Sequence, residues 1–328
     1  MTKRLAEVAK KAGVSEATVS RVLNGRNGVS EATRETVLTA LDVLGYERPT
    51  KLRGERGRLV GLVLPELQNP IFPALAEVVT ASLAQRGFTP LLAARTIGGV
   101  PERDYIEMLL DHQVSGVVFA GGSYALADAE HGHYRALTDR RMPVVMVNAG
   151  VSDLGFPHIS TDDAVAVEQA YGHLRSLGHE RVGMVMGPED HVPSRRKLAA
   201  LEGKDIQVER TNFSMESARL AAAKLIDRGV TGMICASDVL ALGSIRAARR
   251  LGLDVPGDVS VVGFDDSALM TCTDPPLTTV RQPIELMGQS AVDLLVNQIE
   301  GSGVEPDELL FEPELVVRGS TAPARKRG

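Results

Sequence analysis

A short segment near the N-terminus carries side chains whose types and spacing suit contacts with the edges of nucleic-acid bases. Ser15, Glu16 and Ala17 are consecutive, and Arg21 follows one helical turn later. An arginine can donate two hydrogen bonds to guanine O6 and N7, a glutamate can accept one from cytosine N4, and an alanine can pack on the thymine methyl. These side chains would serve that chemistry at the start of a helix in the major groove. A helix cap at Ser15 and an ordinary surface arginine at Arg21 are the alternatives.

Three short helices are expected to position that segment. The first has apolar residues at i, i+3, i+4 and i+7 spacing, namely Leu5, Val8, Ala9 and Ala12. Gly13 ends it, Ser15 is a suitable N-cap for the second helix, and Asn24-Gly25 is a turn signal. A third helix begins at Ser30 and ends at Gly45, with its inward residues predicted to be Val37, Leu38, Leu41 and Leu44. This pattern predicts an all-α helix-turn-helix domain.

From residue 59 onward, short apolar segments alternate with amphipathic helical patterns. Strands are predicted at Leu59–Leu64, Pro90–Ala94, Gly116–Ala120, Val144–Asn148, Val182–Met186, Ile206–Arg210, Gly232–Ala236 and Val259–Phe264. The helical segments between them include Pro73–Arg86, Asp162–Leu177 and Asp238–Leu251. Apolar strands that alternate with helices predict an α/β fold with parallel sheets. The length favours two similar lobes with a break near Pro157, and a ligand is expected in the cleft where the strands end.

Basic residues are concentrated at the N-terminal end. The chain has 328 residues and a net charge of −6, with 44% hydrophobic residues, which is typical of a folded protein. Residues 1–58 hold twelve Lys and Arg against seven Asp and Glu, whereas the other 270 residues hold 24 against 35. This asymmetry fits a polyanionic partner for the N-terminal part alone, although a basic solvated face is the alternative.

Several classes of protein are disfavoured by what the sequence lacks. No apolar run reaches the ~18 residues that span a bilayer, and the first residues lack the apolar core of a signal peptide. Cys235 and Cys272 lie outside any metal-binding spacing, so neither a zinc site nor a disulfide framework is expected. Phosphate-loop, dinucleotide and nucleophile-elbow motifs are absent. We therefore expect a cytoplasmic protein that is not an enzyme and uses no cofactor, no metal and no membrane.

Longer phrases carry a family resemblance. Residues 4–24 read RLAEVAKKAGVSEATVSRVLN and residues 28–46 read GVSEATRETVLTALDVLGY. Together with SLGHERVGMVMGP, ASDVLALGSIRAARRLGLDVPGDVSVVGFDDS and PPLTTVRQP, they closely resemble the LacI/GalR (lactose-repressor) family of transcriptional regulators over essentially the whole chain. The phrases PERDYIEMLLDHQVSGVVFAGG and DHVPSRRKLAA, and a short linker, look most like the maltose/maltodextrin-regulator branch.

The resemblance implies a domain plan. Residues 1–46 would form the DNA-binding head, 47–58 a short hinge, and 59–328 a two-lobed body that resembles periplasmic sugar-binding proteins and dimerises. The N-lobe would take about 59–157 plus 282–308, and the C-lobe about 158–281 plus 309–320. Two heads on a homodimer would read a palindromic operator in double-stranded DNA.

The same resemblance assigns roles within the head. The family's base-reading positions fall on Glu16, Ala17 and Arg21. Positions that contact the DNA backbone fall on Ser15, Thr18, Ser20, Asn24 and Thr33, and Tyr46 is a further candidate for DNA binding. In the hinge, Leu52 matches a leucine that wedges into the minor groove, but the hinge is about three residues shorter than usual and Gly54 follows. An ordinary linker leucine is the alternative.

In the body, the resemblance implies an effector-binding cleft. Its candidate residues are Asn69, Phe72, Asn148, Arg195, Lys197, Ser237, Asp238 and Asp265. Asp265 is the strongest candidate because it directly follows a predicted strand, although a turn-forming role is the alternative. Two departures weaken the inference of the ligand: Lys197 replaces an arginine that could form a bidentate fork, and Ser237 replaces an asparagine. The helix after Lys197 must also be short. Stacking on a sugar would use Phe72, Tyr124, Tyr171 or Phe264, the last of which is better suited to the core.

These features predict a repressor of carbohydrate-utilisation genes that a maltose-type sugar releases from its operator. A co-repressor or non-sugar metabolite in the cleft is the first alternative. A solute-binding protein is a remote second one, because the basic head and the lack of a signal peptide oppose it.

Overall fold

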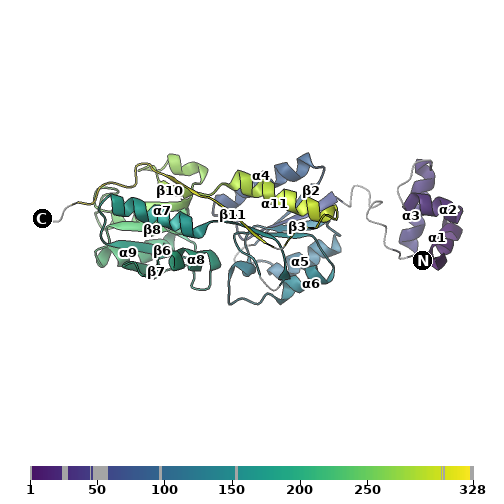
Figure 1. The fold of residues 1–328 in the computed structure, drawn as a ribbon, viewed down its shortest axis with the longest axis horizontal. Coiled ribbons are helices and arrows are strands. Elements are labelled where there is room, and N and C mark those ends of the chain that lie inside the picture. The colour runs from purple at the N-terminus through teal and green to yellow at the C-terminus, as the bar shows by residue number, and fades with distance from the viewer. Residues whose placement is uncertain are drawn as a thin grey trace. The chain divides into compact units, whose positions relative to one another are not determined.

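The computed structural model describes residues 2–23, 29–44, 46, 58–95, 98–151, 154–303, 305 and 307–325. They form two compact units, residues 1–59 with 109–115 and residues 60–108 with 116–328. Figure 1 shows the elements of each unit. None of the helices among these residues is long and apolar enough to cross a bilayer.

The N-terminal helices form the predicted helix-turn-helix. They are α1 (Thr2–Ala12), α2 (Glu16–Leu23) and α3 (Glu31–Val43). Gly13 has a φ of +68°, a left-handed conformation that ends α1 at little cost in a residue without a Cβ. The buried residues of the three helices form one apolar core, made of Val8, Ala9, Ala12, Val19, Val22, Val37, Ala40 and Leu41. Leu44, predicted to face inward, is exposed because it lies beyond the last turn of α3, and Ala40 fills the core instead.

The first lobe of the body is built on a six-stranded sheet of order β11-β5-β4-β3-β1-β2. Its strands are β1 (Leu59–Leu64), β2 (Thr89–Ala94), β3 (Gly116–Phe119), β4 (Val144–Val147), β5 (His158–Thr161) and β11 (Glu308–Phe311). β1, β3, β4, β5 and β11 pair in parallel. Helices α4 (Ile71–Gln85) and α11 (Ile284–Ile299) cover one face, and α5 (Glu102–Asp111) and α6 (Arg135–Asp139) the other (Figure 1).

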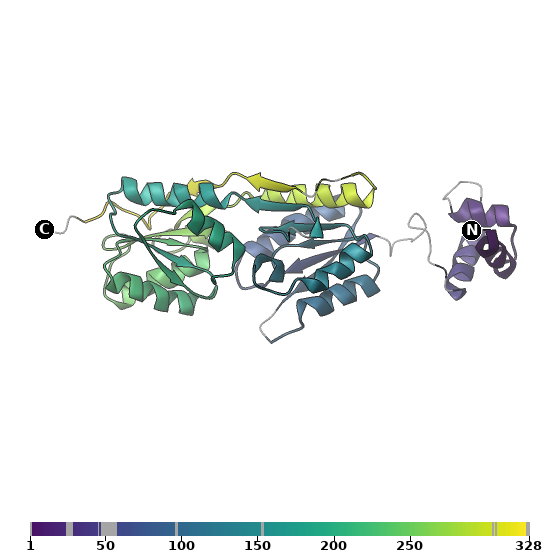
Figure 2. The ribbon, with the colours of Figure 1, turned by 60° about the horizontal axis from the view of Figure 1, so that its bottom comes forward.

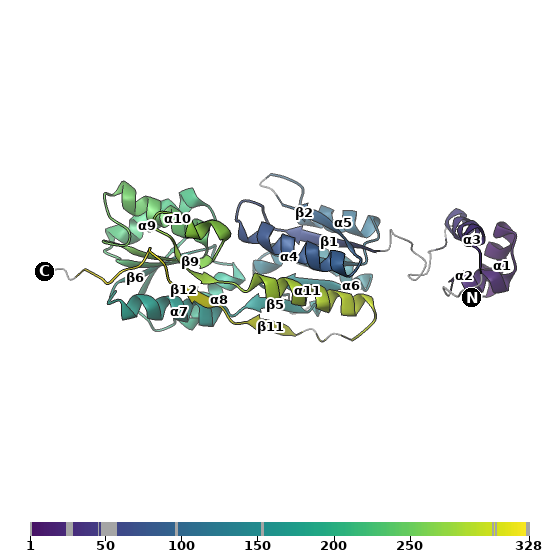
Figure 3. The ribbon, with the colours of Figure 1, turned by 90° about the horizontal axis from the view of Figure 1, so that it is seen from above.

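The second lobe repeats this plan with the order β12-β10-β9-β8-β6-β7. Its strands are β6 (Val182–Met186), β7 (Ile206–Arg210), β8 (Gly232–Cys235), β9 (Ser260–Asp265), β10 (Thr278–Arg281) and β12 (Glu314–Val316). They pair in parallel, except that β12 is antiparallel to β10. Helices α9 (Met215–Asp227) and α10 (Asp238–Arg250) pack on one face, and α7 (Asp163–Ser176) and α8 (Val192–Ala200) on the other (Figure 3). The predicted α/β fold with two lobes of mostly parallel strands is confirmed.

The predicted boundary between the lobes needs correction. β5 pairs with β4 and β11 in the first sheet, so the first crossing follows residue 161 rather than 157. β11 likewise extends the first lobe beyond residue 308, and β12 begins the return to the second lobe. The chain passes between the lobes three times, at 161–163, 281–284 and 311–314 (Figures 2 and 3). β5, β10, β11 and β12 were not predicted, because they are three or four residues long and mix polar with apolar side chains.

Candidate functional site

The exposed face of α2 carries the residues predicted to read bases. Val19 and Val22 are fully buried in the core of the helical head. Glu16, Ala17 and Arg21 are exposed on the other side of the same helix. Because residues four apart share a helix face, Ala17 and Arg21 lie one above the other. The local geometry therefore leaves this face of α2 open to a partner.

Serine side chains begin both α2 and α3. Ser15 Oγ accepts a hydrogen bond from the Thr18 amide at 3.2 Å and lies 2.9 Å from Thr18 Oγ1. Ser30 Oγ makes the same contacts with Thr33, at 3.3 Å and 2.8 Å. Each cap satisfies an amide that has no partner inside its helix. The predicted helix cap at Ser15 is thus confirmed, and its hydroxyl is held at the N-terminal end of α2.

The remaining predicted DNA contacts have mixed placements. Ser20 is half-buried on α2. The Tyr46 hydroxyl donates a hydrogen bond to the Glu7 carboxylate, and its ring packs against the core of the head, which ties the end of the head to α1. Asn24 and Leu52 lie outside the described residues.

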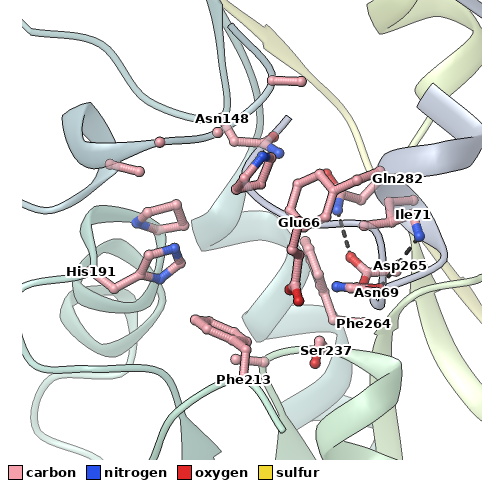
Figure 4. A pocket seen from close by; sticks show the side chains of 18 of the residues that line it. Glu66, Asn69, Ile71, Asn148, His191, Phe213, Ser237, Phe264, Asp265 and Gln282 are labelled. Atoms are coloured by element: carbon pink, nitrogen blue, oxygen red, sulfur yellow. Dashed lines mark hydrogen bonds between the residues drawn. The ribbon is translucent and has the colours of Figure 1, made fainter. Parts of the chain in front are cut away.

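A cavity of about 220 Å³ lies between the two lobes of the body. Residues that follow β1, β3 and β4 line it from the first lobe, and residues that follow β6 and β8 or end β9 line it from the second. The carboxyl ends of parallel strands are where open α/β sheets bind ligands. Figure 4 shows amide, carboxylate, imidazole and phenyl groups around one space.

Six of the eight predicted cleft residues line this cavity, namely Asn69, Phe72, Asn148, Lys197, Ser237 and Asp265. Asn148 directly follows β4 and has a left-handed φ of 72°. A non-glycine residue in that conformation stores backbone strain, and such residues gather at functional sites. Asn148 is therefore held at the cavity by the fold around it.

Asp265 is the most constrained of these residues. It ends β9 with a φ of 118° and is 4% exposed. Its Oδ1 accepts a hydrogen bond from Gln282 Nε2 at 2.7 Å, and its Oδ2 accepts one from Asn69 Nδ2 at 3.3 Å (Figure 4). Burial raises the pKa of Asp265 well above its usual range, and the nearby Asp238 adds to this. Since Asn69 belongs to the first lobe, the carboxyl group of Asp265 joins both lobes beside the cavity.

Two predicted residues do not reach the cavity. Arg195 is exposed on α8, because the inward positions of this helix are Pro193, Ser194 and Lys197. Asp238 lies fully buried behind the cavity, where it accepts hydrogen bonds from the Ser267 amide at 2.8 Å and Thr279 Oγ1 at 2.6 Å. Burial raises the pKa of Asp238 to about 6. Asp238 therefore joins segments of the second lobe instead of lining the site.

Lys197 faces the cavity but is occupied by its neighbours. Its ammonium group contacts the Asp163 carboxylate, and Nζ lies 3.9 Å from the centre of the Phe264 ring. Lys197 and Asp163 are each only 6% exposed. The helix that carries Lys197 ends at Ala200, so the predicted short helix is confirmed.

Sequence reasoning missed several polar and aromatic residues of the lining, among them Glu66, Arg95, Asp163, His191, Phe213 and Gln282. Glu66 and Arg95 could have been found, because each lies within two residues of the end of a predicted strand. His191 gave no such signal. Its Nδ1 lies 2.9 Å from Ser194 Oγ, and its ring packs edge-on against Phe213. Burial, with Lys197 nearby, lowers the pKa of His191 to about 3, so the ring is neutral at pH 7.

The aromatic part of the lining consists of Phe72, Phe213 and Phe264. Phe264 serves both the cavity and the core of the second lobe. Tyr124, one of the predicted stacking residues, is buried in the first lobe, where its hydroxyl donates to the carbonyl oxygens of Phe119 and Val147. Tyr171 packs in the core of the second lobe and does not line the cavity.

A helix-turn-helix head and a two-lobed body with a cavity between the lobes define a class of DNA-binding regulators, and comparison with known proteins gives the family. Residues 4–49 match the model of bacterial regulatory proteins of the lacI family, and residues 171–321 match a periplasmic binding protein-like domain. The HTH-type transcriptional regulator MalR of Streptomyces coelicolor is 50% identical, over 99% of this chain and 98% of its own.

Solved structures agree with this match. A complex of the transcriptional regulator CelR with cellobiose has 33% identity and a TM-score of 0.71, and covers 96% of this chain and 99% of its own. The lac repressor dimer bound to operator and the anti-inducer ONPF has 28% identity and a TM-score of 0.70, and covers 96% and 98%. The chain belongs to the lacI family, and it is a DNA-binding transcriptional regulator rather than an enzyme.

Proposed function

We propose that this regulator represses carbohydrate-utilisation genes and leaves its operator when a maltose-type sugar occupies the cavity. The observation that carries the proposal is the lining of the cavity, where three phenyl rings lie among amide and carboxyl groups. Sugars offer an apolar ring face and a rim of hydroxyl groups, which such a lining complements. The similarity to CelR, solved in complex with cellobiose, supports a sugar as the class of ligand.

Within this proposal, each group has a role. Asp265, Asn69 and Asn148 would exchange hydrogen bonds with sugar hydroxyl groups, and Ser237 would add one more. Phe72 and Phe264 would cover the apolar faces of the sugar ring.

On the DNA side, the regulator would act in the cytoplasm as a homodimer that reads a palindrome. The domain limits proposed for it are a head of residues 1–46, a hinge of 47–58 and a body from residue 59. Glu16, Ala17 and Arg21 would contact base edges, and Leu52 would wedge into the minor groove at the centre of the operator. A pyrimidine–purine step, which unstacks easily, would suit that centre.

The test is operator affinity with and without sugar. A palindromic operator is selected from random DNA, and its affinity is measured at fixed salt with maltose, cellobiose, lactose and ribose added singly. The proposal predicts that a maltose-type sugar weakens binding at least tenfold, about 1.4 kcal/mol of coupling. Tight DNA binding that no sugar changes would remove the sugar effector and leave the regulator. Sugar binding without a steep loss of DNA affinity at rising salt would contradict the role of the basic head.

A further inference from the structure

The cavity contains cationic side chains that are already neutralised within the protein. Among the described residues of the lining, the permanently charged cations are Arg95 in the first lobe and Lys197 in the second. Arg95 Nη1 lies 3.3 Å from Glu102 Oε2, and the Lys197 ammonium contacts Asp163 Oδ1. His191 adds no charge at pH 7, since burial lowers its pKa to about 3. Each cation is therefore paired with a buried carboxylate, although the side chain of Arg95 is 39% exposed and that of Lys197 only 6%.

The Glu102 carboxylate is held in place from several sides. It is 4% exposed, and it accepts hydrogen bonds from the Ser123 amide and Ser123 Oγ, each at 3.1 Å, and from the Tyr134 hydroxyl. Burial works to raise the pKa of Glu102, but hydrogen bonds from His133, Tyr134 and Ser123, with the charge of Arg95, hold it below its usual value. Glu102 thus remains an anion behind the cavity wall.

The backbone beside Glu102 is fitted to this carboxylate. A Cβ at Gly122 would lie 2.5 Å from Glu102 Oε2, so the backbone at this position approaches closely only because it is glycine. Gly122 itself lines the cavity. Glu102 therefore organises both the arginine and part of the first-lobe wall without lining the cavity itself.

Asp163 is the carboxylate that pairs with the second cation, Lys197. It is the first residue of α7, where the partial positive charge of the helix favours an anion. Burial raises the pKa of Asp163, and the ammonium group of Lys197 opposes that rise. Lys197 also lies against the Phe264 ring, so its charge is directed to groups of the protein. Glu66 and Asp265 add two more carboxyl groups to the lining, and neither attracts an anion.

We propose that Glu102 and Asp163 make the cavity selective for uncharged ligands, so that a phosphorylated sugar binds more weakly than its neutral parent. This selectivity rests on the proposed function of the cavity as the effector site. It names the class of effector as a neutral sugar. It also assigns specificity to two carboxylates, one in each lobe, that act through the cations they neutralise.

The test compares matched ligand pairs by calorimetry at pH 7 and constant ionic strength. The pairs are maltose with maltose 6′-phosphate and trehalose with trehalose 6-phosphate. The wild type should bind the phosphate ester at least tenfold more weakly than the parent. Asp163→Asn and Glu102→Gln, which keep the side-chain shape, should each raise the ester-to-parent affinity ratio at least tenfold. A merely structural role would lower the affinity for both members of a pair alike.

Glu209→Gln is the matched control, because it removes the same charge outside the cavity. Glu209 is 13% exposed and pairs with Lys224 and Arg228. This variant should leave the ratio unchanged, and melting temperatures establish which variants are folded. A wild type that prefers the ester would overturn the proposal, and a folded Asp163→Asn or Glu102→Gln protein that keeps the wild-type ratio would overturn it for that carboxylate.

Failure of the sugar-effector role is a separate result. If the wild type binds none of these sugars, inorganic phosphate is the probe. Thermal stabilisation by phosphate in Asp163→Asn and Glu102→Gln, but not in Glu209→Gln or the wild type, would support the proposal that the two carboxylates neutralise the cations. Equal responses in all four proteins would overturn that proposal.

Discussion

The head and the body present their candidate functional residues in opposite ways. In the head, Glu16, Ala17 and Arg21 lie within six positions of one another and project from one helix face. In the body, the lining of the cavity runs from Pro65 to Gln282 and gathers residues from both sheets. The head therefore needs only a stable helix to present its groups, whereas the body needs a complete fold. A surface site tolerates local change, and a cavity between lobes couples its ligand to the arrangement of the lobes.

The largest effect is expected where the lobes meet at Asp265. Asp265→Ala removes a carboxyl group that would accept hydrogen bonds from the sugar and that receives them from Asn69 and Gln282. Sugar affinity should fall about 100-fold, close to 3 kcal/mol, because two or more hydrogen bonds to the sugar would be lost, at ~0.5–1.5 kcal/mol each. Operator affinity without sugar, measured by fluorescence anisotropy, should change much less than sugar affinity.

Asp258→Ala supplies the control for that change. Asp258 pairs with Arg325 in the second lobe and does not line the cavity. Its loss should leave sugar affinity as it is. If both variants bind sugar as the wild type does, Asp265 has no role in the effector site.

The corresponding change in the head is Arg21→Ala. It should reduce affinity for the selected operator by about 1–3 kcal/mol and relax the preference at one base position in each half-site. Arg21→Lys should keep the salt dependence but lose that preference, because a lysine cannot form the bidentate pair. Gel-shift titrations against single-base operator variants give both readings, and an unchanged base preference in Arg21→Ala would place base reading elsewhere.

Lowering the pH should destabilise the body through His191, a residue type that the head lacks. All seven histidines lie beyond residue 58, so the head has none. Burial lowers the pKa of His191 to about 3, against about 6.5 in an unfolded chain, so the unfolded state binds the proton more readily. Stability from the neutral ring is complete above pH 6.5 and is lost as pH falls toward 3.

Between pH 7 and pH 5, the body of the wild type should lose on the order of 2 kcal/mol more than that of His191→Gln. Denaturant unfolding at the two pH values measures this difference. Carboxyl groups that titrate in the same range contribute to both proteins and cancel. Equal losses in the two proteins would mean that the imidazole is not held neutral.

The smallest effect is expected at the helix caps. Ser15→Ala and Ser30→Ala each remove an N-cap, at a cost of about 1 kcal/mol of head stability. Unfolding of the body should be unaffected in both. Ser15→Ala should also weaken operator binding beyond the matched Ser30→Ala change, since Ser15 is the one proposed to contact the DNA backbone. Circular dichroism and anisotropy on the two proteins make this comparison.

The same contrast explains which parts of the fold could be predicted from the sequence. The helices of the head follow from local signals, such as the apolar spacing of α1 and the serine caps, and the resemblance to a known family supplied the candidate contacts. In the body, long apolar strands such as β1 and β9 were predicted, because burial on both faces makes them continuous apolar runs. Short strands of mixed composition such as β5 were missed, since their strand conformation depends on pairing with neighbouring strands rather than on their own composition.

The residues of the cavity likewise divide into those that the sequence could predict and those that it could not. Asn69, Asn148 and Asp265 come directly after strands or close to them, where topology alone places a side chain at the ligand edge. Arg195 was misplaced because the rotation of a nine-residue helix cannot be fixed from its sequence. Glu102 and Asp163 gave no signal, because their roles depend on cations brought to them by other elements.

The coupling between the two regions can be tested most directly through its reciprocity. Maltose affinity is measured by calorimetry on the free protein and on the protein saturated with operator, under the salt conditions of the operator titrations. If maltose weakens operator binding, the operator must weaken maltose binding by the same factor. The account predicts at least a tenfold loss in both directions. Maltose that binds equally well with and without operator would contradict it, because the cavity would then have no influence on the head.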